Sequence, residues 1–184
     1  MGGEKDKGGD GVSERKFRAV IITGPGFQDE EFIYPFYRLQ EAGFLVDVAT
    51  LYQTNVYGKY GVPARATMDT RQLWAHDFDL VVLPGGFEAP DRVRCDKDVL
   101  DFVKRMDANG KIIAAICHGP WVLISADVVR GRSVTAYESI ADDLRNAGAH
   151  YIEAPVVRDR NIITAPHYRN NGDFMREVLA RFGA

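Results

Sequence analysis

The amino-acid sequence predicts an α/β protein of the doubly wound class, in which helices cover both faces of a mostly parallel sheet. Short apolar runs alternate with amphipathic stretches along most of the chain, an order typical of parallel strands joined by helices. The chain has 184 residues, of which 46% are hydrophobic and 27% charged. It contains no internal repeat and no dividing linker, so we expect one domain with one core over residues 16–184.

The expected strands are short apolar runs. In chain order they are residues 17–23, 44–50, 79–86, 111–117, 133–137, 151–157 and 161–166. The segment 51–70 is less regular. Its Tyr-Gly-Lys-Tyr-Gly-Val-Pro sequence favours a loop or a small hairpin.

The expected helices lie between these runs, at residues 29–43, 97–110, 119–129 and 172–182. The first has acidic residues in its opening turn and ends at Gly43; Pro35 either bends it or ends a short first segment. The second carries an apolar stripe of Val99, Phe102, Val103 and Met106.

Composition limits the function classes. The formal net charge of −3 argues against nucleic acid as a partner, and no apolar run is long enough to cross a bilayer. Residues 1–15 are Gly-rich and polar and have the character of a solvated tail rather than a signal peptide. Two cysteines without an export signal predict free thiols and a cytoplasmic location. The four histidines have no metal-ligand spacing, and we expect no metal or other cofactor.

The stretch IIAAICHGP at 112–120 is the strongest indication of chemistry. Cys117 ends a buried strand, and Gly119 and Pro120 open the next helix, which is the arrangement of a nucleophile elbow. The N–H groups at the helix start should lower the pKa of Cys117 and hold an oxyanion. The alternative is a small buried side chain at a strand end. Because adjacent residues on a turn usually point apart, His118 is open to a supporting role as well as a catalytic one.

Several stretches together resemble the ThiJ/PfpI superfamily, in its PfpI-type intracellular protease and glyoxalase III-like branch. They are FQDEEFIYPFYRLQEAG, YGKYGVP, DLVVLPGG, APDRVR, AAICHGPWVLISADVVRGR and SIADDLRNAGA. The resemblance runs from Phe17 to the C-terminus. It implies a flavodoxin-like fold and a homo-oligomer, at least a dimer and in this branch a hexamer.

The resemblance also implies roles for single residues. Cys117 matches the nucleophile, and Glu31 matches an acid that hydrogen-bonds its sulfur. Gly86 matches a glycine whose N–H joins that of His118 in an oxyanion hole. Asp91 falls where this branch has a glutamate that reaches a neighbouring subunit, and it is one methylene shorter.

At other positions that the resemblance places near the thiol, the family varies or this sequence departs from the family pattern. Tyr137 falls where relatives carry a tyrosine or a histidine, and Gln28 replaces a second glutamate. His167 and Arg169, in the segment 165–171, either add polar groups to the pocket for an anionic or polar carbonyl substrate, or belong to an exposed loop. Repulsion by a thiolate would keep Glu31 protonated, so that it could donate a hydrogen bond to sulfur and relay protons.

Four functions follow from these residues. The first is a cofactor-independent enzyme in which Cys117 adds to a small reactive carbonyl compound such as methylglyoxal, with Glu31 shuttling a proton; the same chemistry would remove early glycation adducts. The second is a peptidase that uses Cys117, His118 and Asp91 of another subunit. The third is a redox or stress sensor in which Cys117 is oxidised. The fourth is a specialised hydratase or lyase.

Overall fold

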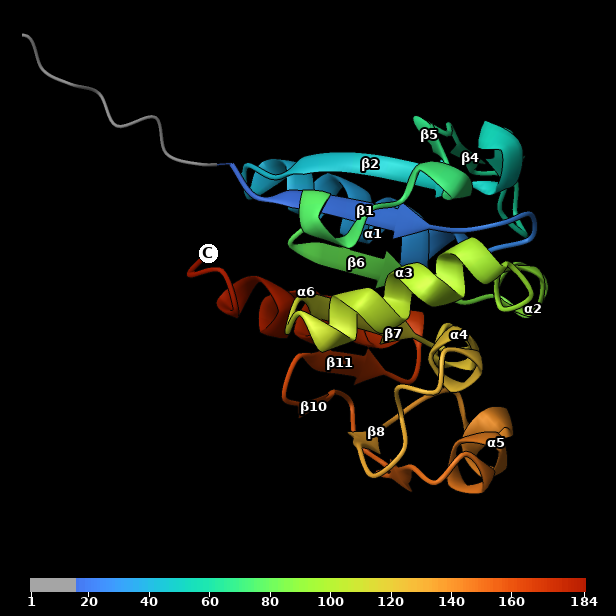
Figure 1. Ribbon diagram of the computed structural model, residues 1–184, viewed down its shortest axis with the longest axis vertical. Helices are drawn as coiled ribbons and strands as arrows, with labels where there is room; N and C mark the ends of the chain where they lie inside the picture. The colour runs from blue at the N-terminus through green and yellow to red at the C-terminus, as the bar shows by residue number, and fades with distance from the viewer. Residues whose placement is uncertain (1–15) are drawn as a thin grey trace, which may run out of the picture.

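The computed structural model describes residues 16–184, and the expected tail at 1–15 lies outside them. These residues form a seven-stranded sheet of order β10-β11-β7-β6-β1-β2-β5 (Figure 1), parallel throughout except for the β10–β11 pair. Its strands are β1 (Arg18–Ile22), β2 (Leu45–Thr50), β5 (Met68–Asp69), β6 (Leu80–Leu83), β7 (Ile112–Ile116), β10 (Val157–Asp159) and β11 (Ile162–Ala165). Two small pairs are β3 (Val56–Tyr57) with β4 (Pro63–Ala64), and β8 (Ser133–Val134) with β9 (His150–Tyr151).

Helices connect the strands. They are α1 (Asp29–Glu41), α2 (Glu88–Val93), α3 (Lys97–Ala108), α4 (Pro120–Ser125), α5 (Ala141–Asn146) and α6 (Asn171–Ala180). Short 3₁₀ turns lie at Leu51–Gln53, Thr70–Gln72, Ala75–Asp77, Glu138–Ile140 and Tyr168–Asn170. None of the helices in residues 16–184 is both long enough and apolar enough to span a membrane.

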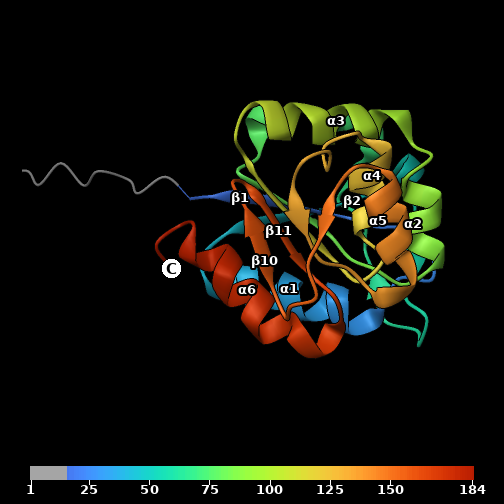
Figure 2. The same ribbon diagram turned by 90° about the horizontal axis from the view of Figure 1, so that it is seen from below.

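Both faces of the sheet are buried, because side chains alternate along each strand. In β1, Ala19 and Ile21 join the apolar cluster that contains α1 and α6 residues, while Val20 and Ile22 join the cluster that contains α3 and α4 residues. Figure 2 shows α3 on one side of the sheet and α1 with α6 on the other. This three-layer arrangement confirms the predicted doubly wound α/β class.

Most expected elements are present, and the differences have local causes. The segment 51–70 contains the β3–β4 hairpin, as predicted, and also supplies β5 to the main sheet. The expected strand at 151–157 is wrong: it is split between β9 and β10, because Pro155 lacks the N–H that a continuous strand would need. The expected helix at 119–129 ends at Ser125, just before Asp127 takes a backbone φ of 52°.

Two short helices, α2 and α5, were not expected from the sequence. Each has only six residues, and Pro90 interrupts the helical sequence pattern of α2. Pro35 lies inside the single helix α1 and does not end a separate segment.

The order in which the strands are added to the sheet changes direction at β1. From β1 the chain moves outward to β2 and β5, and then returns to the opposite side of β1 to build β6 and β7. In doubly wound sheets the carboxyl ends of strands at such a switch form the usual ligand crevice. The ends of β1, β6 and β7 therefore define where a site is expected.

Candidate active site

Cys117 follows directly after β7 and has a left-handed backbone, with φ 61°. This conformation is uncommon for a residue with a side chain and costs about 1–3 kcal/mol. Two hydrogen bonds hold it: the Cys117 N–H donates to the Ala165 carbonyl at 2.9 Å, and the Cys117 carbonyl accepts from the Tyr137 N–H at 3.0 Å. Since α4 begins at Pro120, the predicted sharp turn from strand to helix is present.

Two glycines allow the chain to close around this turn. A Cβ on Gly119 would collide with the Leu83 carbonyl oxygen. A Cβ on Gly85 would lie 2.5 Å from Oε2 of Glu31 and 2.6 Å from Cβ of Cys117. The absence of a side chain at Gly85 is thus what allows the acid of α1 to approach the thiol.

Glu31 is fully buried in the first turn of α1. Its Oε2 accepts a hydrogen bond from the Gly85 N–H at 2.8 Å, while Oε1 has no hydrogen bond of standard geometry. Burial raises the pKa of Glu31 to about 8, against the smaller lowering effects of the Gly85 N–H and the Cys117 thiol. The carboxyl group is therefore mainly protonated at neutral pH, as the sequence predicts, although burial rather than repulsion is the main cause.

The thiol of Cys117 does not have the lowered pKa expected from the helix start. Burial raises the pKa of Cys117, and ionised Glu31 raises it further. The N–H groups of Gly86 and His118 act in the opposite direction and are outweighed. The expectation was wrong because a sulfur whose residue is 7% exposed loses more hydration than two amide dipoles replace.

The backbone N–H groups of Gly86 and His118 nevertheless both interact with the sulfur of Cys117. The family resemblance assigns these same two groups to an oxyanion hole. Gly86 reaches this position with φ 83°, a conformation that favours glycine. A Cβ there would lie 2.5 Å from the Gly26 carbonyl oxygen. The geometry thus provides two donors beside the one nucleophilic atom of the site.

His118 faces the thiol rather than away from it. Its Nδ1 lies 3.4 Å from Sγ of Cys117, and its Nε2 lies 3.1 Å from Oγ of Ser139. The ring stacks on Tyr137, with centroids 5.1 Å apart, and meets Trp121 edge-on. Because burial lowers the pKa of His118, the imidazole is neutral at neutral pH and one ring nitrogen can accept a proton.

Aromatic side chains continue from His118 along one side of the site. Tyr137 stacks on His167 at 6.0 Å between centroids, and His167 contacts Tyr168 at 4.0 Å. The backbone of Tyr168 also interacts with the Glu31 carboxyl. The segment 165–171 therefore reaches the site through His167 and Tyr168. Arg169 is exposed and lies over the Tyr168 ring.

Gln28 and Asp91 do not contact the thiol. Gln28 is buried at the start of α1 and donates through Nε2 to Glu30 at 2.7 Å. Asp91 is exposed on α2, and its backbone carbonyl accepts a hydrogen bond from the Cys95 thiol at 3.5 Å.

Sequence reasoning missed two members of the site. Gly85 contacts Glu31 and Ser139 contacts His118, yet the two lie in segments far apart in the chain. The paired glycines after β6 were the one available signal. In residues 16–184, no group of three or more histidine, cysteine, aspartate or glutamate side chains is placed to hold a metal ion.

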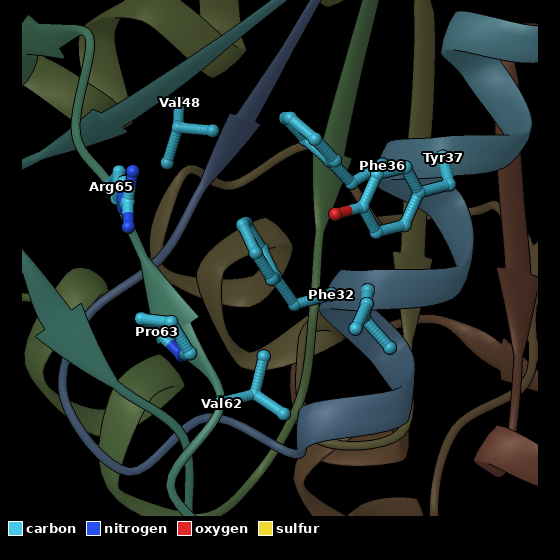
Figure 3. Close-up of a pocket in the computed structure, with 8 residues that line it drawn as sticks. Phe32, Phe36, Tyr37, Val48, Val62, Pro63 and Arg65 are labelled. Atoms are coloured by element: carbon cyan, nitrogen blue, oxygen red, sulfur yellow. The ribbon is translucent and has the colours of Figure 1, made fainter.

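A separate hollow of about 360 Å³ lies between α1 and the β3–β4 hairpin (Figure 3). We call it the α1 groove. It is lined by Phe32, Ile33, Phe36, Tyr37, Val48, Val62, Pro63 and Arg65. Its walls are mainly apolar and include neither Cys117 nor Glu31, so it is distinct from the thiol site.

The site consists of a buried cysteine on a strand-to-helix turn, an acid that faces it and two backbone N–H donors. It lies where the strand order of the sheet changes direction. These features define a class of doubly wound proteins with a cysteine centre. The model of the DJ-1/PfpI family matches residues 17–181. The chain belongs to this family, which confirms the resemblance seen in the sequence.

Relatives with curated names cover nearly the same length. A deglycase of Pyrococcus abyssi is 41% identical over 88% of this chain and 97% of its own. The deglycase PfpI of Pyrococcus furiosus is 38% identical over the same shares. YraA of Bacillus subtilis, whose name proposes a cysteine protease, is 40% identical over 88% of this chain and 95% of its own.

Solved structures agree with the fold. DJ-1beta of Drosophila melanogaster superposes with a TM-score of 0.83 at 32% identity, covering 89% of each chain. A two-domain protein of Anabaena variabilis with DJ-1/ThiJ/PfpI-like and ferritin-like domains gives a TM-score of 0.89 at 37% identity. The match covers 91% of this chain and 48% of that longer one.

Proposed function

We propose that this protein is a cysteine-dependent enzyme that acts on small reactive carbonyl compounds, with glyoxalase or deglycase chemistry and no cofactor. The observation that carries the proposal is the convergence of Glu31, His118 and two backbone N–H groups on the sulfur of Cys117. Relatives named deglycase, 38–41% identical over 88% of the chain, support the same class of reaction.

The small exposure of the nucleophile favours a small substrate. Cys117 is 7% exposed, and the half-buried rings of His118 and Tyr137 lie next to it. A sulfur with so little exposed surface favours an aldehyde of a few heavy atoms over a larger substrate. A folded polypeptide substrate would first require the surrounding segments to move.

The first step forms a hemithioacetal. Sγ of Cys117 bonds to the aldehyde carbon, the carbonyl π electrons move to its oxygen, and the thiol proton passes to Nδ1 of His118. For this, Nε2–H of His118 donates to Oγ of Ser139, which leaves Nδ1 free to accept the proton. The N–H groups of Gly86 and His118 stabilise the negative oxygen, which then takes the proton.

The second step moves a hydrogen within the adduct of a 2-oxoaldehyde. Ionised Glu31 takes the proton from the carbon that bears sulfur, which gives an enediolate, and returns one to the neighbouring carbonyl carbon. The hydroxyl proton of the hemithioacetal passes to the neighbouring oxygen, so that the carbon that bears sulfur becomes the thioester carbonyl. The result is a thioester of a 2-hydroxy acid, with no external oxidant or reductant. Water then cleaves the carbon–sulfur bond and releases the hydroxy acid and the thiol. A carboxyl pKa of about 8 makes both protonation states of Glu31 available near neutral pH.

Lactate formation from methylglyoxal tests this function. The wild type and a Cys95→Ala variant should produce lactate at similar rates, while Cys117→Ala should lose activity by on the order of 1000-fold or more. Cys95 is the matched control because it is the exposed free cysteine of the described residues. Equal lactate production by Cys117→Ala would disprove the proposal, as would an absence of turnover with methylglyoxal, glyoxal and their early protein adducts.

Peptidase activity is the second candidate, favoured by the similarity to YraA. Because Asp91 is exposed on α2, it is available to a second copy of the chain, and self-association would be needed to bring it to His118. Casein cleavage confined to an oligomeric fraction, and lost on Asp91→Asn, would support this activity. Cleavage that persists in the Asp91→Asn variant would count against it.

A further inference from the structure

Trp121, the second residue of α4, is half-buried and lies beside the imidazole of His118. The two rings meet edge-on, with centroids 5.0 Å apart and an angle of 69° between their planes. Tyr137 stacks on the same imidazole, with centroids 5.1 Å apart and an angle of 25°. Because aromatic rings prefer such edge-on and stacked arrangements, the two neighbours together define the plane of the imidazole.

Asp143 fixes the indole of Trp121. The indole Nε1–H donates a hydrogen bond to Oδ2 of Asp143 at 2.8 Å. Asp143 lies in the first turn of α5, which packs beside α4 (Figure 2). This N–H is the single donor of the indole, and a hydrogen bond to a carboxylate is stronger than one between neutral groups. The bond therefore sets the rotation of the indole, although the two residues are 22 positions apart in the chain.

Arg94 holds the same indole by its face. Arg94 directly follows α2, and its guanidinium lies over the Trp121 ring at 5.3 Å from the centroid. Its Nε donates to Oγ of Ser125, the last residue of α4, at 2.9 Å. A guanidinium over an indole is attracted to the electrons of the ring. The indole is thus held at its N–H by α5 and on its face by the residue that ends α2.

Asp143 also acts on His118 through its charge. Burial lowers the pKa of His118, and the negative charge of Asp143 partly opposes this effect because it favours the imidazolium. The other titratable groups next to the ring are the Cys117 thiol and the Tyr137 phenol, while Arg94 lies over Trp121. The carboxylate that holds the indole therefore also favours proton acceptance by the imidazole.

We propose that Trp121 and Asp143 are positioning residues for His118. Asp143 fixes the indole, and the indole holds the imidazole in the orientation in which Nδ1 faces the Cys117 thiol. The inference rests on the proposed function, in which His118 accepts the thiol proton. It places the acid that supports the histidine in the same chain, whereas the peptidase candidate takes Asp91 from a second copy.

NMR of the protein without substrate tests the contact between Trp121 and Asp143. Asp143→Ala removes the acceptor, so the indole Nε1–H signal of Trp121 should shift and exchange faster with water. The indole signal of Trp74, which is 54% exposed, should stay in place and serves as the internal control.

The pKa of His118, followed through its ring Cε1–H signal, tests the effect of the charge. Asp143→Asn keeps an oxygen that can accept the indole N–H and removes the negative charge, so the pKa of His118 should fall. Asp142→Asn is the matched control, because Asp142 is the neighbouring acid of α5 and pairs with Arg145 at 2.7 Å. It should move the pKa of His118 less than Asp143→Asn does.

Turnover of methylglyoxal tests the positioning role. Trp121→Phe and Asp143→Ala should lower kcat about two- to tenfold. KM should stay near the wild-type value, because the imidazole acts on the proton in transfer and not on substrate binding. Asp143→Asn should retain most of kcat. The acid limb of its kcat/KM profile should move to lower pH, since a His118 of lower pKa is already neutral at lower pH.

Three outcomes would overturn the inference. They are an unchanged Trp121 indole signal and His118 pKa in Asp143→Ala, an equal pKa change in Asp142→Asn and Asp143→Asn, and wild-type turnover in both Trp121→Phe and Asp143→Ala. An inactive wild type would refute the proposed function, and the NMR measurements, which need no substrate, would still decide whether Asp143 fixes the indole. Because Asp143 is exposed, its variants should fold and carry the test even if Trp121→Phe does not.

Discussion

Nδ1 of His118 lies 3.4 Å from Sγ of Cys117, although the two residues are neighbours in the chain. Side chains of adjacent residues normally point apart. Here the two meet on a turn in which Cys117 has a left-handed backbone, with φ 61°. On its other side the imidazole meets Ser139 and the ring of Tyr137. The histidine is thus held between the thiol and a hydroxyl from a segment twenty-one residues further along the chain.

Ser139→Ala should loosen the orientation of His118. In the proposed mechanism Nε2–H of His118 donates to Oγ of Ser139, so loss of this acceptor should lower kcat/KM for methylglyoxal about two- to tenfold, while Ser139→Thr should retain most of it. The ¹⁵N chemical shifts of the His118 ring should report one neutral tautomer in the wild type and a mixture in Ser139→Ala. Unchanged ring shifts in the alanine variant would contradict this role.

Glu31→Gln should change how stability depends on pH. The pKa of Glu31 is raised from 4.5 to about 8 in the folded protein, so between these pH values the native state binds more protons than the unfolded state. The free energy of unfolding therefore loses a contribution as pH rises through this window. Urea unfolding at pH 5 and pH 8 should show a fall in the wild type, on the order of a few kcal/mol, that is absent in Glu31→Gln.

The comparison between the two proteins is needed because His118, whose pKa is lowered, contributes with the opposite sign in the acid range. Its effect is the same in both and cancels in the difference. A Glu31→Gln variant whose stability falls between pH 5 and pH 8 as steeply as that of the wild type would refute the prediction.

Alkylation of Cys117 should be slow at neutral pH. Burial raises the pKa of this thiol, so iodoacetamide should modify exposed Cys95 first. The second comparison uses two proteins that both carry Cys95→Ser, one with Glu31 and one with Glu31→Gln. At pH 9, Cys117 should be alkylated several-fold faster in the protein with Glu31→Gln, because the ionised carboxylate that opposes the thiolate is removed. Mass spectrometry of the modified peptide measures both rates; a Cys117 that reacts faster than Cys95 at pH 7 would contradict the assigned pKa direction.

Gly119→Ala should destabilise the turn. The added Cβ meets the backbone oxygen of Leu83, which lies in a central strand and has little room to move, so the cost should reach about 1–3 kcal/mol or more. Gly172→Ala is the matched control, because Gly172 lies in α6 with nothing within 4 Å of the added carbon. Its helix should gain about 0.5–1 kcal/mol. Thermal unfolding followed by circular dichroism should move the two midpoints in opposite directions.

The sequence was sufficient for features that depend on local pattern. Apolar runs and amphipathic stretches predicted the layers, and the CHGP turn after an apolar strand identified Cys117 as the centre of the site. Turn residues in the segment 51–70 indicated a loop or a small hairpin, and the second alternative is the β3–β4 pair. These features are encoded within a few neighbouring residues, where side-chain periodicity and backbone preference act directly.

The tertiary structure alone decided the electrostatics and the composition of the site. Local sequence favoured a lowered pKa for Cys117, but burial under neighbouring segments reverses the direction. Gly85 meets Glu31 across fifty-four residues, and Ser139 meets His118 across twenty-one. Hydration lost on burial and contacts between distant segments depend on how the whole chain packs, and no short stretch of sequence contains that information.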